Sequence, residues 1–269
     1  MASPYELPDG NVLLSISGGR TSAYMLHKIL EVNGDLPDRC RVVFANTGRE
    51  MPETLDFVQE CSDRWNVKIT WLEYILPKPK FKIVSHNSAS RNGEPFLQSV
   101  TSVTKDRYLP NQVQRYCTQQ LKVLTIKRFL VSEGWKSWTN TVGIRADEAH
   151  RVKPSKDKRW QNWFPLNNAN VSVKNISDFW RQSNFDLKIM KGAGNCDGCF
   201  LKSEATIAAM WREYPDRMKW WSDLESKTNA RFHKNRTYAE IGDFVSRQGD
   251  FIFDNEAVLC QKDFGECVI

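Results

Sequence analysis

A short segment near the N-terminus constrains the fold most, because it joins an apolar strand to an amphipathic helix through two glycines. Residues 11–14 (Asn-Val-Leu-Leu) are typical of a buried parallel strand, and apolar residues at 25, 26, 29 and 30 share one helical face. Between them, positions 15–22 read Ser-Ile-Ser-Gly-Gly-Arg-Thr-Ser. Glycines let the backbone approach a phosphate, and free N–H groups at a helix start point toward it. The segment predicts an anion-binding turn, although an ordinary serine-capped turn fits the same pattern.

Strands and helices then alternate along the chain. Apolar runs at 41–46, 67–72 and 138–142 predict strands, and helical periodicity covers 52–65 and 117–131. This alternation predicts an α/β fold with a doubly wound, Rossmann-like parallel sheet, whose ligands bind at the carboxyl ends of the strands. The proline-containing polar stretch 77–112 predicts an inserted loop. Helical patterns at about 203–228 and 236–247 predict a helical C-terminal region.

Two segments resemble one known family. Positions 17–22 are similar to the PP-loop (Ser-Gly-Gly-x-Asp-Ser) of the adenine-nucleotide α-hydrolase superfamily, and 46–54 (Asn-Thr-Gly-Arg-Glu-Met-Pro-Glu-Thr) resemble the Asp-Thr-Gly-x-x-x-Pro-Glu-Thr segment of phosphoadenylyl-sulfate (PAPS) and adenylyl-sulfate reductases. The chain is identified as a member of the PAPS-reductase-like family. The resemblance implies a PP-loop nucleotide-binding domain over 1–190 and a cysteine-containing, mostly helical region over 191–269. It also implies a strand at 164–166, followed by a helix at 171–180.

The resemblance implies an adenine-nucleotide site, with ATP or PAPS as the ligand. Segment 143–145 (Gly-Ile-Arg) resembles the family's Gly-x-Arg loop, whose arginines clamp phosphate or sulfate, and Arg151 is the second arginine. Thr21 stands where the PP-loop usually has aspartate, so Asp147 and Glu148 are candidate Mg²⁺ ligands in its place. Arg145 and Asp147 are therefore candidate catalytic residues. The predicted nucleotide-binding residues are Ser15, Ser17, Gly18, Gly19, Arg20, Thr21, Ser22, Asn46, Thr47, Gly48, Gly143, Arg145 and Arg151.

A second candidate site consists of cysteines. Cys196 and Cys199 have the Cys-x-x-Cys spacing of a metal knuckle. Iron–sulfur reductases carry Cys-Cys-x-x-Arg-Lys far upstream of such a pair, and here Cys117 stands at the first of those cysteines and Thr118 at the second. The resemblance implies metal ligation by Cys117, Cys196 and Cys199, in a 4Fe–4S cluster with one open iron. Zinc is the alternative, since thiolates suit both metals.

Two cysteines near the C-terminus leave further alternatives open. Either Cys260 or Cys267 could be a fourth cluster ligand. Cys267 follows a glutamate, which resembles the Glu-Cys tail of the reductases, whose cysteine attacks sulfur; it is the third candidate catalytic residue. The family's tail continues to a histidine, whereas this sequence ends two residues after Cys267. By contrast, Cys40 and Cys61 lie at core-type positions and are expected to be buried hydrophobes.

The absent second cysteine and the short tail favour a sulfurtransferase over a plain reductase. We expect an iron–sulfur ATP pyrophosphatase of PP-loop type that adenylylates an acceptor and then transfers sulfur, as in tRNA thiolation or DNA phosphorothioation. A cysteine desulfurase is an expected sulfur-donor partner. One alternative is a PAPS or adenylyl-sulfate reductase that forms sulfite. Another is a non-enzymatic nucleotide- or nucleic-acid-binding module with structural zinc.

The composition is that of a globular protein, and it limits the classes of partner and the cellular location that we expect. The chain is 41% hydrophobic with a net charge of +6, which suits nucleotide or nucleic-acid partners without choosing between them. Cations and tryptophans mix within 151–163, as on nucleic-acid-binding surfaces, although a solvated basic loop is the commoner structure with this pattern. No apolar run reaches membrane-spanning length and the N-terminus lacks signal-peptide features, so we expect a cytoplasmic protein with no membrane partner.

Overall fold

The computed structural model describes residues 3–248 and contains a six-stranded sheet of order β4-β3-β2-β1-β5-β6. Its strands are β1 (Val12–Ile16), β2 (Cys40–Asn46), β3 (Ile69–Glu73), β4 (Lys82–Val84), β5 (Trp138–Thr141) and β6 (Trp160–Trp163). All neighbouring strands pair in parallel except β3 and β4, which are antiparallel. The predicted α/β fold with a doubly wound, mostly parallel sheet is confirmed.

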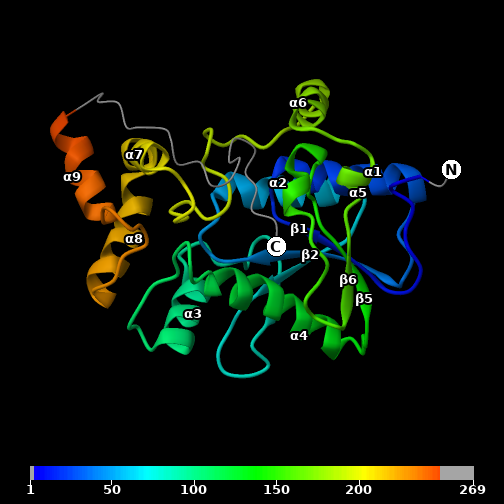
Figure 1. Ribbon diagram of the computed structural model, residues 1–269, viewed down its shortest axis with the longest axis horizontal. Helices are drawn as coiled ribbons and strands as arrows, with labels where there is room; N and C mark the ends of the chain where they lie inside the picture. The colour runs from blue at the N-terminus through cyan, green and yellow to red at the C-terminus, as the bar shows by residue number, and fades with distance from the viewer. Residues whose placement is uncertain (1–2, 249–269) are drawn as a thin grey trace.

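Helices cover both faces of this sheet (Figure 1). On one face lie α1 (Arg20–Asn33), α2 (Pro52–Arg64), α5 (Pro165–Asn168) and α6 (Val173–Gln182), whose apolar side chains pack with Val12, Leu14 and Ile16 of β1. On the other face, α4 (Thr125–Ser132) packs with Leu13 and with Val43 of β2. Because successive side chains of a strand point to opposite faces, β1 contributes to the hydrophobic cores on both faces of the sheet.

The C-terminal helices are α7 (Glu204–Glu213), α8 (Pro215–Thr228) and α9 (Tyr238–Gln248), and they lie together at one end of the molecule (left in Figure 1). They share a hydrophobic cluster with Met51, Tyr74 and Phe96 of the preceding chain. The predicted helical C-terminal region is therefore confirmed, and its core is continuous with Met51, Tyr74 and Phe96 from the preceding part of the chain. The division into units 1–190 and 191–269 stays a prediction.

Two sequence predictions about local structure are wrong. The stretch 77–112 is not one inserted loop, because it contains β4 and α3 (Glu94–Thr104), a helix that buries Phe96 and Val100. The predicted strand at 164–166 is displaced: the strand ends at Trp163, and Pro165 begins α5, where the N–H that proline lacks is not needed. Consequently the end of the basic stretch 151–163 is the edge strand β6.

Two helices that border the candidate site depart from α-helical geometry. The predicted helix at 117–131 begins as the π-helix η1 (Thr118–Leu124) and continues as α4. The 3₁₀-helix η2 (Ala146–Arg151) follows β5 and carries the predicted arginine loop. Within the described part of the chain, no helix has both the length and the apolar composition needed to cross a bilayer.

Candidate functional site

The predicted phosphate loop joins β1 to α1 in a fixed conformation. Gly18 has a φ of +84°, and a Cβ at this position would lie 2.6 Å from Cγ2 of Thr54. The hydroxyl of Ser22 accepts a hydrogen bond from the Ser17 N–H (3.1 Å) and donates one to the Gly19 carbonyl (3.0 Å). Helix α1 starts after Gly19 with no side-chain cap. Since a helix N-terminus attracts anions, this geometry supports the predicted phosphate-binding turn.

Arg20, predicted as a phosphate-binding cation, already has an anionic partner. Its Nε and Nη2 donate to the two carboxylate oxygens of Asp186 at 2.6 and 2.8 Å, and Nη2 also donates to the Leu187 carbonyl. A phosphate would have to compete with this bidentate pair. The role of Arg20 in nucleotide binding stays a prediction, and in this structure the side chain joins α1 to the segment after α6.

Arg145 lies against the phosphate loop. Its side chain is fully buried, its Nη1 is 3.5 Å from the Thr21 hydroxyl, and its Nε donates to Asp147 at 3.0 Å. Glu148 forms ion pairs with both Arg145 and Arg151. The two predicted arginines and the acids between them therefore form one charged network, at the carboxyl end of β5 and beside the turn after β1.

The segment after β2 is held by its own side chains. Asn46 is fully buried; its Nδ2 donates to Glu73 at 2.7 Å, and its Oδ1 accepts from the N–H of Gly48 at 3.0 Å. The Glu50 carboxylate accepts hydrogen bonds from both the N–H and the hydroxyl of Thr47. The Thr47 hydroxyl also lies 3.1 Å from Sγ of Cys196. In this structure Asn46 shapes the turn, and Thr47 links it to the cysteines.

The three predicted metal-binding cysteines line one small cavity. Cys117, Cys196 and Cys199 surround a volume of about 40 Å³ together with Thr47 and Lys122. Within residues 3–248, no three His, Cys, Asp or Glu side chains are close enough together to hold a metal ion. The thiol donor set fits zinc or an iron–sulfur cluster, whereas the cavity as it stands has room for a single ion, so a cluster would require the thiols to move apart.

The environment of Cys196 keeps its sulfur protonated in the metal-free protein. Burial raises the pKa of the Cys196 thiol well above its usual range, and the nearby Glu50 carboxylate raises it further. Lys122 and the hydrogen bond from Thr47 act in the opposite direction. Because a thiolate is the metal-binding form, metal uptake here must release a proton.

A buried carboxylate that the sequence pattern did not single out positions the cysteine loop. Asp197 is fully buried and accepts hydrogen bonds from Arg49 (2.8 Å), Arg217 (2.5 Å) and the Trp221 indole (2.6 Å). Its own N–H donates to the Arg49 carbonyl, next to the bridge between Glu50 and Cys196. Asp197 thus ties the cysteine loop to the segment after β2 and to α8. No local pattern in the sequence pairs these residues.

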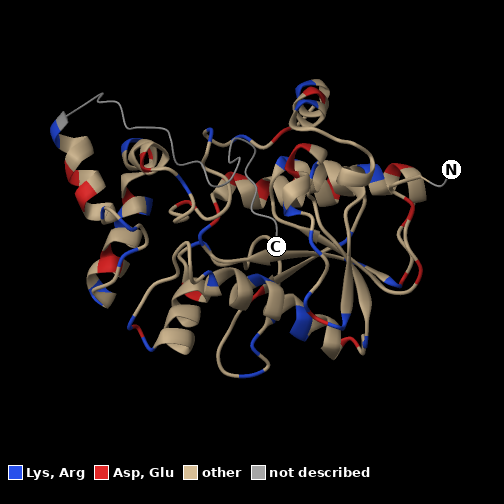
Figure 2. Ribbon diagram, viewed as in Figure 1, with Lys and Arg blue, Asp and Glu red and all other residues tan. Residues whose placement is uncertain are grey.

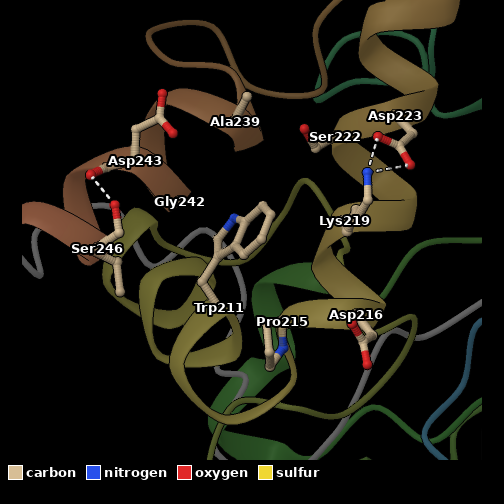
Figure 3. Close-up of a pocket in the computed structure, with 11 residues that line it drawn as sticks. Trp211, Pro215, Asp216, Lys219, Ser222, Asp223, Ala239, Gly242, Asp243 and Ser246 are labelled. Carbon is tan, nitrogen blue, oxygen red and sulfur yellow. Dashed lines mark hydrogen bonds and ion pairs between the residues drawn. The ribbon is translucent and has the colours of Figure 1, made fainter.

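Among the cavities that residues 3–248 form outside the predicted cysteine site, one adjoins the sheet and one adjoins the C-terminal helices. One, of about 840 Å³, opens on the α4 face of β1, β5 and β6, and its lining includes the predicted residue Ser15. The other, of about 560 Å³, lies among α7, α8 and α9 beside Trp211, Asp216 and Asp243 (Figure 3), and none of the predicted site residues lines it. Cys260 and Cys267, the candidate fourth ligand and tail nucleophile, lie outside the described residues.

Comparison with known proteins agrees with the motifs. The family model of the phosphoadenosine phosphosulfate reductase domain matches residues 11–247. The uncharacterized nin region protein ORF290 of Escherichia phage lambda is 28% identical over 234 residues, which are 85% of this chain and 79% of that protein. Phosphoadenosine 5'-phosphosulfate reductase of Vibrio cholerae is 40% identical over 60 residues, 22% of either chain.

One solved structure is similar to part of the chain. The crystal structure of PAPS reductase from Candida auris, in a phosphate complex, aligns with a TM-score of 0.42 and 16% identity, over 67% of this chain and 79% of that one. The family assignment rests instead on the family model, which spans most of the chain. The protein belongs to the phosphoadenosine phosphosulfate reductase domain family, as its two nucleotide-site motifs predicted.

Proposed function

We propose that this protein is a PP-loop enzyme that activates an acceptor with an adenine nucleotide and then transfers sulfur to it, with a nucleic acid as the acceptor. The observation that carries the proposal is the 3.1 Å contact between the Thr47 hydroxyl and Cys196. This contact brings a cavity of three thiols to the end of β2, which pairs directly with β1 and its phosphate loop. The predicted phosphate loop and the three thiols therefore lie at the same edge of the sheet, which supports the proposal.

The proposed reaction has two steps. An acceptor oxygen attacks the α-phosphorus of ATP, the bond to the β-phosphate breaks, and pyrophosphate leaves. Sulfide from a donor protein then displaces AMP, so one sulfur replaces one oxygen and no redox change occurs at the acceptor. The first-turn N–H groups of α1 and the buried guanidinium of Arg145 are suited to stabilise the charge on the reacting phosphates. Mg²⁺, if it takes part, has Asp147 nearby as a carboxylate ligand.

The thiol cavity would supply the sulfur chemistry. Cys117, Cys196 and Cys199 would hold a 4Fe–4S cluster once the thiols had moved apart, and such a cluster would supply an iron site able to carry sulfide. To test the ligand set, the protein is purified anaerobically, and iron, acid-labile sulfide and zinc are measured. We expect iron and sulfide near a 4:4 ratio in the native protein, loss of both in Cys117→Ser, and retention of both in Cys40→Ser, whose thiol is buried away from the cavity. Stoichiometric zinc without sulfide would instead support the structural-zinc alternative.

Turnover is tested with ATP and candidate acceptors. We expect pyrophosphate release that depends on the acceptor, and we expect it to persist in Cys267→Ser. The first step uses no tail thiol, so that substitution separates nucleotide activation from tail chemistry. Absence of pyrophosphate release with transfer RNA and with DNA would contradict the proposal.

The second candidate is a PAPS or adenylyl-sulfate reductase, favoured by the family assignment and by the short match to the Vibrio cholerae enzyme of that name. In that reaction a cysteine thiolate attacks the sulfur of the sulfonucleotide, the nucleotide leaves, and a dithiol reductant then releases sulfite. Incubation with PAPS and reduced thioredoxin distinguishes the candidates. Sulfite formation that disappears in Cys267→Ser would establish the reductase and overturn the sulfurtransferase.

A further inference from the structure

We propose that the groove on the α4 face of β1, β5 and β6 binds a single-stranded segment of nucleic acid, which it presents to the phosphate loop. This inference rests on the proposed function, because it identifies where the acceptor of that reaction binds. The groove measures about 840 Å³, within the range of ligand pockets, and its walls come from η1, α4 and residues 153–157. Its lining combines apolar side chains, among them Val123, Leu124 and Ile126, with cationic ones, among them Arg115, Lys153 and Lys156, which suits a ligand that has both apolar faces and negative charge.

The floor of the groove combines an aromatic pair with an amide pair. In the register of β5 and β6, Trp138 lies opposite Trp160, and Asn140 lies opposite Asn162. The two indoles stack with their centroids 5.2 Å apart and an interplanar angle of 17°, and the Asn140 amide donates to Asn162 at 3.3 Å. Trp160 is only partly buried, and Nζ of Lys127 lies 5.5 Å from its ring centroid, so a base that reaches the exposed part of this indole also meets a cation. Aromatic rings stack with bases, and amides bind base edges, so this floor suits an unpaired base.

The groove reaches both reactive parts of the candidate site. Ser15, two residues before the phosphate loop, lines one end of it, and its buried hydroxyl has no hydrogen-bond partner among residues 3–248. Arg115 lines the groove and also the cavity that contains the three cysteines. A ligand in the groove therefore lies next to the phosphate loop and to the thiol cavity. An acceptor of the proposed reaction requires this position.

The rim of the groove is basic. Lys153 and Lys156 are exposed and make no ion pair with any residue that the structure describes. The single acid of this segment, Asp157, already pairs with Lys127 of α4. Figure 2 shows Lys and Arg segments on α4 and in the chain next to β6.

This basic strip favours a strand over a mononucleotide. It continues beyond the groove through Lys158 and Arg159, both exposed. Unpaired cations along an open rim suit the regularly spaced phosphates of a strand, whereas a mononucleotide would occupy only a small part of them.

The groove is tested by binding alone, without turnover. Fluorescence anisotropy is measured with a labelled 12-nucleotide single strand, as DNA and as RNA of the same sequence, at several salt concentrations. We expect Lys153→Glu/Lys156→Glu to weaken binding at least tenfold and to reduce the slope of log K against log salt by about 1.4, for two lost phosphate contacts. Trp160→Leu should weaken binding several-fold with the salt slope unchanged, because stacking is lost and no charge changes. A preference between the DNA and RNA strands identifies the acceptor class.

The matched control changes the same charges elsewhere. Lys174 and Arg181 of α6 are exposed and lie on the opposite face of the sheet. We expect Lys174→Glu/Arg181→Glu to bind the strand nearly as the native protein does, and urea midpoints check that every variant folds. An equal loss of affinity for the strand in both double variants would overturn the proposal that the groove binds it. So would the absence of binding by the native protein at 50 mM salt.

Three further outcomes separate this inference from the proposed function. If the groove variants lose affinity for ATP but not for the strand, the groove holds the nucleotide and the inference is wrong. If the strand binds through the groove and ATP releases no pyrophosphate, the inference stands and the proposed function fails. If pyrophosphate is released with an acceptor other than nucleic acid and the strand does not bind, the groove inference fails while nucleotide activation stands.

Discussion

The substitution Asp197→Asn tests whether the buried carboxylate holds the cysteine loop to the rest of the structure. Asp197 is fully buried, and its two cationic partners have side-chain exposures of 5% for Arg49 and 20% for Arg217. The amide keeps the shape of the carboxylate and can still accept from the Trp221 indole. It turns an N–H toward the two guanidinium groups, however, and leaves their charges without a buried anion.

The magnitude follows from the burial of these partners. Removing one member of a buried ion pair costs roughly 3–5 kcal/mol, because the remaining charge has no compensation. Water can reach Arg217 more readily than Arg49, so we expect the lower end, about 3 kcal/mol of unfolding free energy. With a urea m-value of roughly 2–3 kcal/mol/M, the midpoint should fall by about 1 M or more.

The assay is equilibrium urea unfolding at pH 7.5, followed by tryptophan fluorescence. Asp223→Asn is the matched control, since Asp223 pairs with Lys219 at the surface of α8, the helix that also carries Arg217, and should contribute less than about 1 kcal/mol. A loss of less than 1 kcal/mol in Asp197→Asn, equal to that of the control, would refute the reasoning. It would mean that Arg49 and Arg217 find other solvation when the charge of Asp197 is removed.

Three further predictions concern the phosphate loop and pH. In Gly18→Ala, the positive φ and the 2.6 Å approach of a Cβ to Thr54 should destabilise the fold by about 2–4 kcal/mol in urea unfolding; an unchanged midpoint would contradict this geometry. Arg145→Ala should weaken nucleotide binding at least tenfold, about 1.4 kcal/mol by calorimetry, and unchanged affinity would show that the phosphates bind elsewhere. Burial lowers the pKa of His27, so the folded state binds fewer protons than the unfolded state and unfolding free energy falls as pH drops below about 6.5. In His27→Gln, urea midpoints at pH 7.5 and 5.5 should differ less than in the native protein, and an equal difference would assign the pH dependence to other groups.

Local pattern predicted the central part of the fold. The strands β1, β2, β3 and β5 and the helices α1 and α2 are each visible as apolar runs or 3.6-residue periodicity, because one or both faces of each element are buried. Helix α3 was missed since its polar Ser and Thr residues hide a narrow apolar stripe. That stripe is stabilised by tertiary contact, with the Phe96 ring 4.9 Å from Trp221 of α8. Packing partners more than 100 residues apart leave no local signal.

The candidate site also contains some features that the sequence predicted and others that depend on contacts between distant segments. The meeting of Cys117 with Cys196 and Cys199 at one cavity was expected from a family resemblance, which carries information about long-range contacts. The partners of Arg20 and of Asp197 could not be expected, because an ion pair between distant segments depends on the assembled fold. Motif residues could therefore be identified from sequence, whereas the residues that position them required the structure.

The π-helix η1 determines the side of the helix on which the charge of Lys122 lies relative to Cys117. In an α-helix, five residues advance roughly 500°, so side chains five apart point about 140° away from each other. The i to i+5 hydrogen bonds of a π-helix bring such residues back onto one side. Cys117 and Lys122 are five apart, and both line the thiol cavity. If the same residues formed a regular α-helix, the ammonium group of Lys122 would point about 140° away from Cys117 and from the thiol cavity, with no change in composition or net charge.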